Sequence, residues 1–228
     1  SQMHKLSIRH SYVNAENLEA RASNPFSINF LNGSEYFVSS THSSALEVQS
    51  LFGPNVSNKL TLGATFVRDD RDPFGADFPT ISADDGASGG YNFGAERFST
   101  ANLLNQDVLT FTNDLTIYKG RHSALFGVNV EYFNAGNLFI RNNFGYYIYE
   151  DGDEMTGIQR FLAGMPADQY QRSFSQVDNV TGDESDALAS FNQILAGFYV
   201  QDEFQVNQKL KITGGLRIDI PFWPTEQP

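Results

Sequence analysis

Hydrophobic residues recur at every second position in several segments of the chain, most clearly in residues 194–220. Between residues 210 and 220 the even positions are aliphatic or Gly, whereas the odd positions are polar, charged or Gly. The even positions of residues 194–204 are also apolar, with Asp202 as the exception. A period of two predicts β-strands that have one apolar and one polar face. The short connection at residues 206–209 therefore predicts an antiparallel hairpin.

Each arm of this hairpin has about 11 residues, a length suited to a tilted strand that crosses a bilayer. Strands of soluble β-sandwiches also alternate, so the pattern alone leaves a sandwich open. The polar face carries charges of both signs opposite an aliphatic face, which favours a strand between lipid and a water-filled lumen. We therefore expect the following side chains to face a lumen: Gln201, Glu203, Lys211, Arg217 and Asp219. Of these, Glu203 and Arg217 have opposite charges and are expected to pair across the hairpin.

The same alternation predicts further strands along the chain. The principal ones are expected at residues 4–13, 35–52, 58–68, 107–118 and 123–133. A shorter strand is expected at residues 169–177. Residues 158–166 are expected to form one or two helical turns, because Gly164 and Pro166 would end a helix there.

The connections between these strands alternate in length. Short ones are expected at residues 53–57, 119–122 and 206–209, and long ones at residues 14–34, 69–105 and 134–192. Short turns at one end and long loops at the other are typical of outer-membrane barrels, whose short turns are periplasmic. The sequence therefore predicts an all-β fold of antiparallel up-and-down strands from a transmembrane β-barrel with long extracellular loops. Because bacterial barrels have at least about 8 strands, about six principal strands predict a partial barrel.

The hairpin also resembles a known family. Its sequence, YVQDEF followed after a short turn by LKITGGLRIDIP, is similar to a hairpin in the barrels of TonB-dependent outer-membrane receptors. The similar positions are Tyr199, Gln201, Asp202, Phe204, Leu210, Gly215, Leu216, Arg217 and Asp219. Phe204 stands where this family usually has Trp.

Two other stretches resemble the same family. In the long connection, the similar residues are Arg71, Asp72, Pro73, Phe78 and Pro79, followed by Gly94, Glu96, Phe98, Ser99, Thr100 and Asn102. The later stretch is YKGRHSALFGVNVEYFNAGNLFIR, residues 118–141. The match in the long connection is more specific than that of the hairpin, because nothing about strand formation requires those residues.

The resemblance implies a large barrel in the outer membrane of a Gram-negative bacterium, with a plug domain of the same full-length protein in its lumen. It implies energised uptake of a nutrient ligand through TonB, and polar-face residues of the hairpin that contact the plug. Residues 1–228 would then be a fragment of one barrel domain, without the plug and the remaining strands. The N-terminus has no signal-peptide pattern, and the C-terminus follows directly on a predicted strand. We therefore expect the chain to be an internal fragment of a longer protein. The alternatives are a non-transport surface protein, such as an adhesin or a passive porin, and a soluble β-sandwich.

Composition excludes several other classes. No run approaches the roughly 18 apolar residues of a membrane helix. The net charge of -12, with 15 Lys and Arg, argues against nucleic acid as a partner. The absence of Cys excludes a disulfide framework and a thiolate metal site. The 4 His lie near no nucleophile or zinc motif, so we expect neither an enzyme nor a cofactor.

Aromatic residues in the long connections are candidates for ligand contacts. The candidates are Tyr146, Tyr147 and Tyr149 with Arg141, and Phe93 with Arg97. Planar rings next to a cation provide faces on which sugars or amphipathic ligands stack. The alternative is that these rings form the outer aromatic girdle at the membrane surface.

One acidic run is a candidate for a divalent ion. Asp151, Asp153 and Glu154 provide oxygen ligands around Gly152, which allows a tight turn between the carboxylates. The run lacks the twelve-residue spacing of an EF-hand loop. An ordinary solvated loop is therefore the alternative interpretation.

Overall fold

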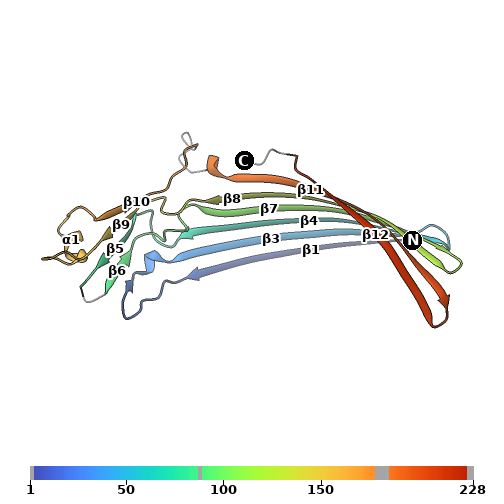
Figure 1. The fold of residues 1–228 in the computed structure, drawn as a ribbon, viewed down its shortest axis with the longest axis horizontal. Helices are drawn as coiled ribbons and strands as arrows, with labels where there is room; N and C mark the ends of the chain where they lie inside the picture. Colours follow the sequence, from blue (N-terminus) through green and yellow to red (C-terminus); the bar gives the residue numbers. More distant parts are fainter. Residues whose placement is uncertain (1–2, 87–88, 178–184, 225–228) are drawn as a thin grey trace.

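The computed structural model describes residues 3–86, 89–177 and 185–224 and consists mostly of β-strands (Figure 1). Its main sheet has seven strands in the order β1-β3-β4-β7-β8-β11-β12, and every neighbouring pair is antiparallel. Their bounds are β1 (His4–Glu19), β3 (Glu35–Leu51), β4 (Val56–Pro73), β7 (Asn102–Lys119), β8 (His122–Phe139), β11 (Ala189–Asn207) and β12 (Leu210–Phe222). The antiparallel all-β fold and its partial extent are confirmed. The seven long strands correspond to the five predicted segments and the two arms of the hairpin, so the expected count of about six was one too low.

The long strands extend further than the alternation predicts. β1 continues to Glu19, β4 continues to Pro73 and β7 begins at Asn102, all in segments that we expected to be loops. At the extended ends of β1 and β4 polar residues occur on both faces, as at Glu16 and Asn17, which pair with Val38 and Phe37 of β3. Backbone pairing continues there without an apolar face, so hydrophobic periodicity does not reveal it.

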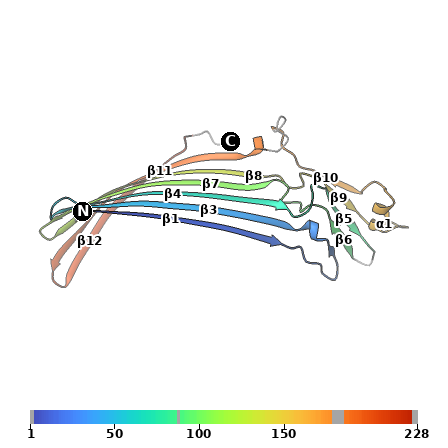
Figure 2. The same cartoon turned by 180° about the vertical axis from the view of Figure 1, so that it is seen from behind.

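Short turns and long connections lie at opposite ends of the main sheet. The strands run side by side along a curved sheet, and both views show the short turns and the N-terminus at one end (Figures 1 and 2). The long connections meet at the other end, where they build a second, smaller sheet. This sorting of connections by length agrees with the layout of outer-membrane barrels.

The second sheet has five short strands in the order β10-β9-β5-β6-β2. They are β2 (Ile28–Asn29), β5 (Thr80–Asp84), β6 (Gly90–Phe93), β9 (Tyr146–Tyr149) and β10 (Gln169–Gln171). The pairs β2–β6 and β5–β9 are parallel and join separate connections. The strand predicted at residues 169–177 is therefore limited to β10, since residues 172–177 have no strand structure.

One short helix, α1 (Gly157–Leu162), packs against this second sheet. The Thr156 side chain accepts a hydrogen bond from the Gln159 backbone, and the Gln159 side chain accepts one from the Thr156 backbone. This reciprocal pair is a capping box, which satisfies two backbone donors at the helix start. Two 3-10 turns, η1 (Leu31–Gly33) and η2 (Ser185–Ala187), complete the described elements. Among the described residues no helix is long and apolar enough to cross a membrane.

The compact core of the structure lies in the second sheet. Ile81, Ala83 and Tyr149 are buried, and Phe93 and Phe161 pack against them. The rings of Phe93 and Phe161 meet edge to face at 5.2 Å between centroids. The buried core therefore lies within the loop end and not between the long strands of the main sheet.

The main sheet leaves its apolar face uncovered. Cross-strand partners share a face, so the register defines one continuous apolar row: Leu46, Leu62, Phe111, Val130, Ala196 and Ile220. On β12, Leu216 is 79% exposed and Ile218 is 64% exposed. A sandwich would bury this face against a second sheet. Because the described residues place no sheet there, the sandwich alternative is wrong.

Candidate functional site

The other face of the main sheet is polar and carries the predicted lumen-facing residues. On the β11–β12 hairpin, Tyr199 pairs with Arg217, Gly197 with Asp219 and Glu203 with Thr213. Direct partners and residues two apart share a face. The register therefore places the five predicted side chains on one face: Gln201, Glu203, Lys211, Arg217 and Asp219.

A hydrogen-bonded network crosses four strands on this polar face. The Tyr199 hydroxyl of β11 donates to Asp114 Oδ1 of β7 at 2.5 Å, although β8 lies between them. The Arg217 guanidinium of β12 lies 5.1 Å from the centre of the Tyr199 ring. Arg217 Nη2 also lies 2.6 Å from Asp219 Oδ1. We call these four side chains, Asp114, Tyr199, Arg217 and Asp219, the polar network.

Glycines make room for the polar network. A Cβ atom on Gly127 of β8 would lie 1.9 Å from the Tyr199 ring, so only Gly allows the ring to pass over β8 toward Asp114. A Cβ atom on Gly197 of β11 would lie 2.4 Å from Arg217 Nη2. The large side chains of Tyr199 and Arg217 lie directly on the backbone at these two positions, which explains why the polar face has Gly there.

The ion pairs of the hairpin differ from the prediction. Glu203 pairs with Lys211 at 2.8 Å, whereas Arg217 pairs with Asp219. The predicted pair of Glu203 and Arg217 is wrong, because Glu203 lies opposite Thr213, about 13 Å along the strand from position 217. The side chains of the Glu203–Lys211 pair are 36% and 50% exposed, so the pair contributes only about 0.2–1 kcal/mol.

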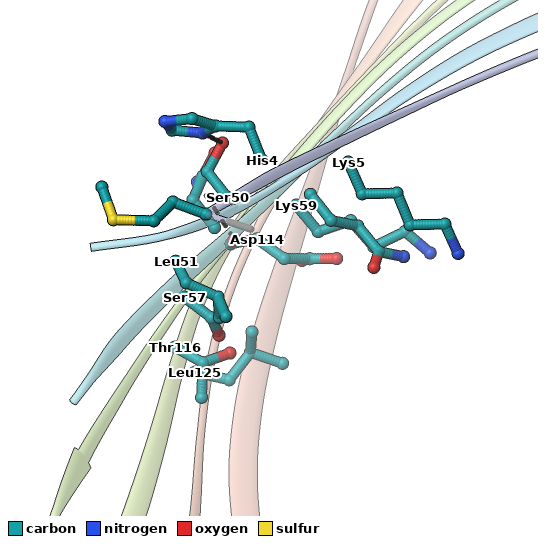
Figure 3. A pocket seen from close by; sticks show the side chains of 12 residues that line it. His4, Lys5, Ser50, Leu51, Ser57, Lys59, Asp114, Thr116 and Leu125 are labelled. Carbon is teal, nitrogen blue, oxygen red and sulfur yellow. Dashed lines mark hydrogen bonds between the residues drawn. The ribbon is translucent and has the colours of Figure 1, made fainter. Parts of the chain in front are cut away.

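A hollow of about 410 Å³ lies at the short-turn end of the first strands (Figure 3). Lys5, Lys59 and Asp114 line it, and Figure 3 shows them beside Thr116 and Leu125. Lys59 also forms an ion pair with Glu47 at 2.9 Å. The hollow continues the polar face from Asp114 toward β1, because Asp114 pairs with Lys59 in the register.

Sequence reasoning missed several members of this face. Lys59, Asp114 and Tyr199 lie on the polar phase of their strands, and that phase was the available signal. The alternation of polar and apolar residues does not give the strand register, and it is the register that brings Tyr199 within reach of Asp114 across β8. A register cannot be read from one strand alone.

The predicted ligand-contact residues divide into two groups at the loop end. Tyr149 is 9% exposed, and its ring packs edge to face on Phe161 at 5.4 Å, so it belongs to the core of the second sheet together with Phe93. Tyr147 lies against Tyr170 at 4.6 Å between ring centres. These rings lie on the second sheet beyond the long strands and not on the strands that would cross a membrane.

Arg97 and Tyr146 do come together. The Arg97 guanidinium lies 4.6 Å from the Tyr146 ring centre and 4.7 Å from that of Phe98, so it is held between two rings. Arg141 is exposed at the start of the turn that precedes β9. The structure thus leaves Tyr146, Tyr147, Arg97 and Arg141 at the surface of the loop end.

One residue of the acidic run at the loop end, Asp151, makes a structural contact. Asp151 Oδ1 accepts a hydrogen bond from the Gly157 backbone at 3.0 Å, while Asp153 and Glu154 are exposed. Within residues 3–86, 89–177 and 185–224, no three His, Asp or Glu side chains are grouped as metal ligands. Partial burial raises the pKa of Asp84, and the nearby carboxylates of Asp151 and Glu150 raise it further.

The amino-acid sequence was compared with models of known protein families. The whole chain, residues 1–228, matches the family described as outer membrane beta barrel domain. The chain belongs to this family. The barrel domain accordingly lies in the Gram-negative outer membrane, where its apolar face contacts lipid.

A solved structure shows the same fold. The barrel domain is similar to the outer membrane transporter YddB from Escherichia coli, with a TM-score of 0.61 and 12% sequence identity. The match covers 97% of this chain and 26% of the transporter, so the chain spans about a quarter of that length. A comparison with curated protein sequences found no match.

Family membership fixes the orientation of the barrel domain. The short turns, such as residues 52–55 and 120–121, lie on the periplasmic side, and the second sheet lies on the extracellular side. The apolar row faces lipid, and the polar network lies on the opposite face. That arrangement is what a wall between lipid and an aqueous interior requires.

Proposed function

We propose that the chain is part of the wall of a TonB-dependent outer-membrane receptor, which takes up a nutrient with energy delivered through TonB. The resemblance of the hairpin at residues 195–221 supports this proposal. The fold shared with a solved outer-membrane transporter agrees with it. The proposal treats residues 1–228 as part of one barrel domain and assigns no catalytic activity to it.

The polar network is the observation that carries the proposal. It holds Tyr199 and Arg217 in place by contacts among β7, β11 and β12, on the face opposite lipid. A wide water-filled passage would not need such fixed side chains on its wall, whereas a docked domain gains from a preorganised surface. In the proposal the plug domain of the full-length protein docks here, on Gln201, Glu203, Lys211, Arg217 and Asp219.

The loop end supplies the ligand surface in this proposal. Tyr146 and Tyr147 of β9, with Arg97 and Arg141, offer planar and cationic groups at the extracellular end. Tyr149 and Phe93 hold the second sheet together beneath them. The nutrient ligand would meet this surface before it enters the lumen. Asp153 and Glu154 are exposed there and available to a weakly held divalent ion.

A plugged receptor and a passive porin differ in conductance. The full-length protein that contains this chain would be purified, inserted into planar lipid bilayers and tested in KCl solution. The proposal predicts a closed barrel that shows no steady conductance. It also predicts that the full-length protein binds the purified periplasmic domain of TonB in a calorimetric titration.

Each alternative has its own result. A steady open conductance without TonB would identify a passive porin and overturn the proposal. A closed barrel that does not bind the TonB domain would indicate a surface protein such as an adhesin. The matched variant is Arg217→Leu, which is expected to open the barrel partially because it removes a plug contact and leaves the apolar face intact.

A further inference from the structure

The lipid-facing surface carries an unusual charged group at its periplasmic end. Asp202 of β11 is the one residue that breaks the apolar phase of residues 194–204. Asp202 Oδ2 lies 2.7 Å from His122 Nδ1 on β8, and the His122 ring stacks on Phe204 at 4.6 Å. The uptake proposal gives these side chains no role, because they lie on the opposite face from the lumen.

A shallow hollow of about 790 Å³ lies beside this group. Ile117, Ala124, Phe126 and Val200 form its apolar floor, and Lys119 and Arg121 lie at its periplasmic rim. A second hollow of about 620 Å³ shares Phe126 and Val200 and extends to Leu216 and Ile218 of β12. Together the two hollows form a continuous apolar groove that runs from the basic rim toward the middle of the membrane. We call it the outer groove.

The outer groove is a true outer surface of the barrel domain. It lies over β7, β8, β11 and β12, of which the first three are interior strands of the sheet. Further strands of a complete barrel would pair with the free edges of β1 and β12 and would leave this face uncovered. In the outer membrane, lipid therefore covers the outer groove.

The polar groups at the rim have unused binding capacity. Among the described residues the Lys119 ammonium has no hydrogen-bond or ion-pair partner. The Arg121 guanidinium donates one hydrogen bond, from Nη1 to the Val206 carbonyl at 3.0 Å, and has further N–H groups. Asp202 lines the hollow with a side chain that is 44% exposed. Its Oδ1 atom is buried and has no hydrogen-bond partner, so only Oδ2, the oxygen that contacts His122, can meet a ligand. The rim thus presents two cations and one carboxylate next to an apolar groove.

We propose that the outer groove binds one phospholipid with an ethanolamine headgroup from the periplasmic leaflet. Lys119 and Arg121 bind the phosphate, since paired cations form charge-assisted hydrogen bonds with it. Asp202 Oδ2, which has a second lone pair besides the one that faces His122, accepts a hydrogen bond from the primary ammonium group. An acyl chain lies along Phe126, Val200 and Leu216.

The headgroup choice follows from Asp202. A glycerol headgroup keeps the phosphate charge but brings no cation to Asp202, whose carboxylate then has only His122 as a partner. A choline headgroup is cationic but has no N–H group to donate to a carboxylate oxygen. Only the ethanolamine headgroup satisfies the cationic rim and the carboxylate together.

Native mass spectrometry of the full-length protein tests the lipid site. The delipidated protein would be titrated with dioleoyl lipids that carry ethanolamine, glycerol or choline headgroups. We expect the first binding event to favour phosphatidylethanolamine at least about threefold over the other two, which corresponds to about 0.7 kcal/mol. Asp202→Asn is expected to abolish this preference, and the double variant Lys119→Ala with Arg121→Ala to weaken all three lipids.

The matched control is Lys209→Ala. Lys209 lies in the neighbouring periplasmic turn and does not line the outer groove, so its loss should leave all three affinities unchanged. Equal binding of the three lipids, or a preference that survives Asp202→Asn, would overturn the lipid site. So would a preference for phosphatidylglycerol. The result is independent of TonB, because the lipid site depends only on the orientation of the barrel domain.

Discussion

Tyr199 of β11 lies across Gly127 of β8 and reaches Asp114 of β7, so one aromatic side chain ties three strands together. The ring occupies the space where any larger residue at position 127 would place its Cβ atom. The register of the three strands is thereby linked to one side-chain contact. A slip by one residue would move Tyr199 to the lipid face.

This contact predicts that Gly127→Ala destabilises the folded barrel. Overpacking of this kind costs about 1–3 kcal/mol, because the ring must move and lose its hydrogen bond to Asp114. The measurement is urea-dependent folding of the full-length protein into lipid vesicles. Gly214→Ala is the matched control, since a Cβ atom there meets nothing within 4 Å.

A double variant separates the clash from a general intolerance of Ala in the strand. Gly127→Ala combined with Tyr199→Ala should lose less stability than the sum of the two single changes, because the clash disappears with the ring. Additive losses would show that the Tyr199 ring is not what requires Gly127.

Alternation predicted the long strands because each one has an apolar face toward lipid. It could not predict the second sheet, in which β5 pairs with β9 although more than 60 residues separate Thr80 from its partner Tyr146. Such pairings depend on tertiary contacts and not on local sequence. For the same reason the sequence cannot predict that the Tyr149 ring, a candidate for ligand contact, is buried against Phe161.

The two faces of β12 predict opposite effects for neighbouring substitutions. Leu216→Arg places a charge on the lipid face and should cost about 2–4 kcal/mol near the middle of the membrane. Arg217→Leu should fold almost normally, because it removes only exposed contacts to Asp219 and Tyr199. Folding of both variants of the full-length protein into lipid vesicles measures the difference. A larger loss for Arg217→Leu would invert the assignment of the faces.

The loop end predicts a pH dependence that involves Asp168. The Glu150 backbone N–H donates to Asp168 and holds its pKa below the usual range, and the Arg160 guanidinium lowers it further. Because the pKa is lower in the folded state, the stabilisation is complete above the ordinary aspartate value of about 3.9 and disappears as the pH falls through the folded value. Asp168→Asn should therefore increase amide hydrogen exchange in residues 150–168 at neutral pH and have no effect once Asp168 is protonated.

Asp84 provides a control, because its pKa is shifted in the opposite direction to that of Asp168. Burial and the neighbouring carboxylates raise its pKa, so its charged form is penalised in the folded state, and the penalty grows as the pH rises above about 3.9. Asp84→Asn should slow hydrogen exchange of β5 and β9 at neutral pH and change nothing in strong acid. Faster exchange at neutral pH would contradict the assigned cause.

The orientation of the β11–β12 hairpin between lipid and lumen underlies both the uptake proposal and the lipid site. Spin labels report it directly, since each single Cys substitution from residue 213 to 219 would carry one label in the full-length protein in vesicles. We predict that accessibility to oxygen, which concentrates in lipid, is high at Gly214→Cys, Leu216→Cys and Ile218→Cys and low at the odd positions between them. The reverse pattern, or no alternation with a period of two, would contradict the membrane-spanning barrel wall.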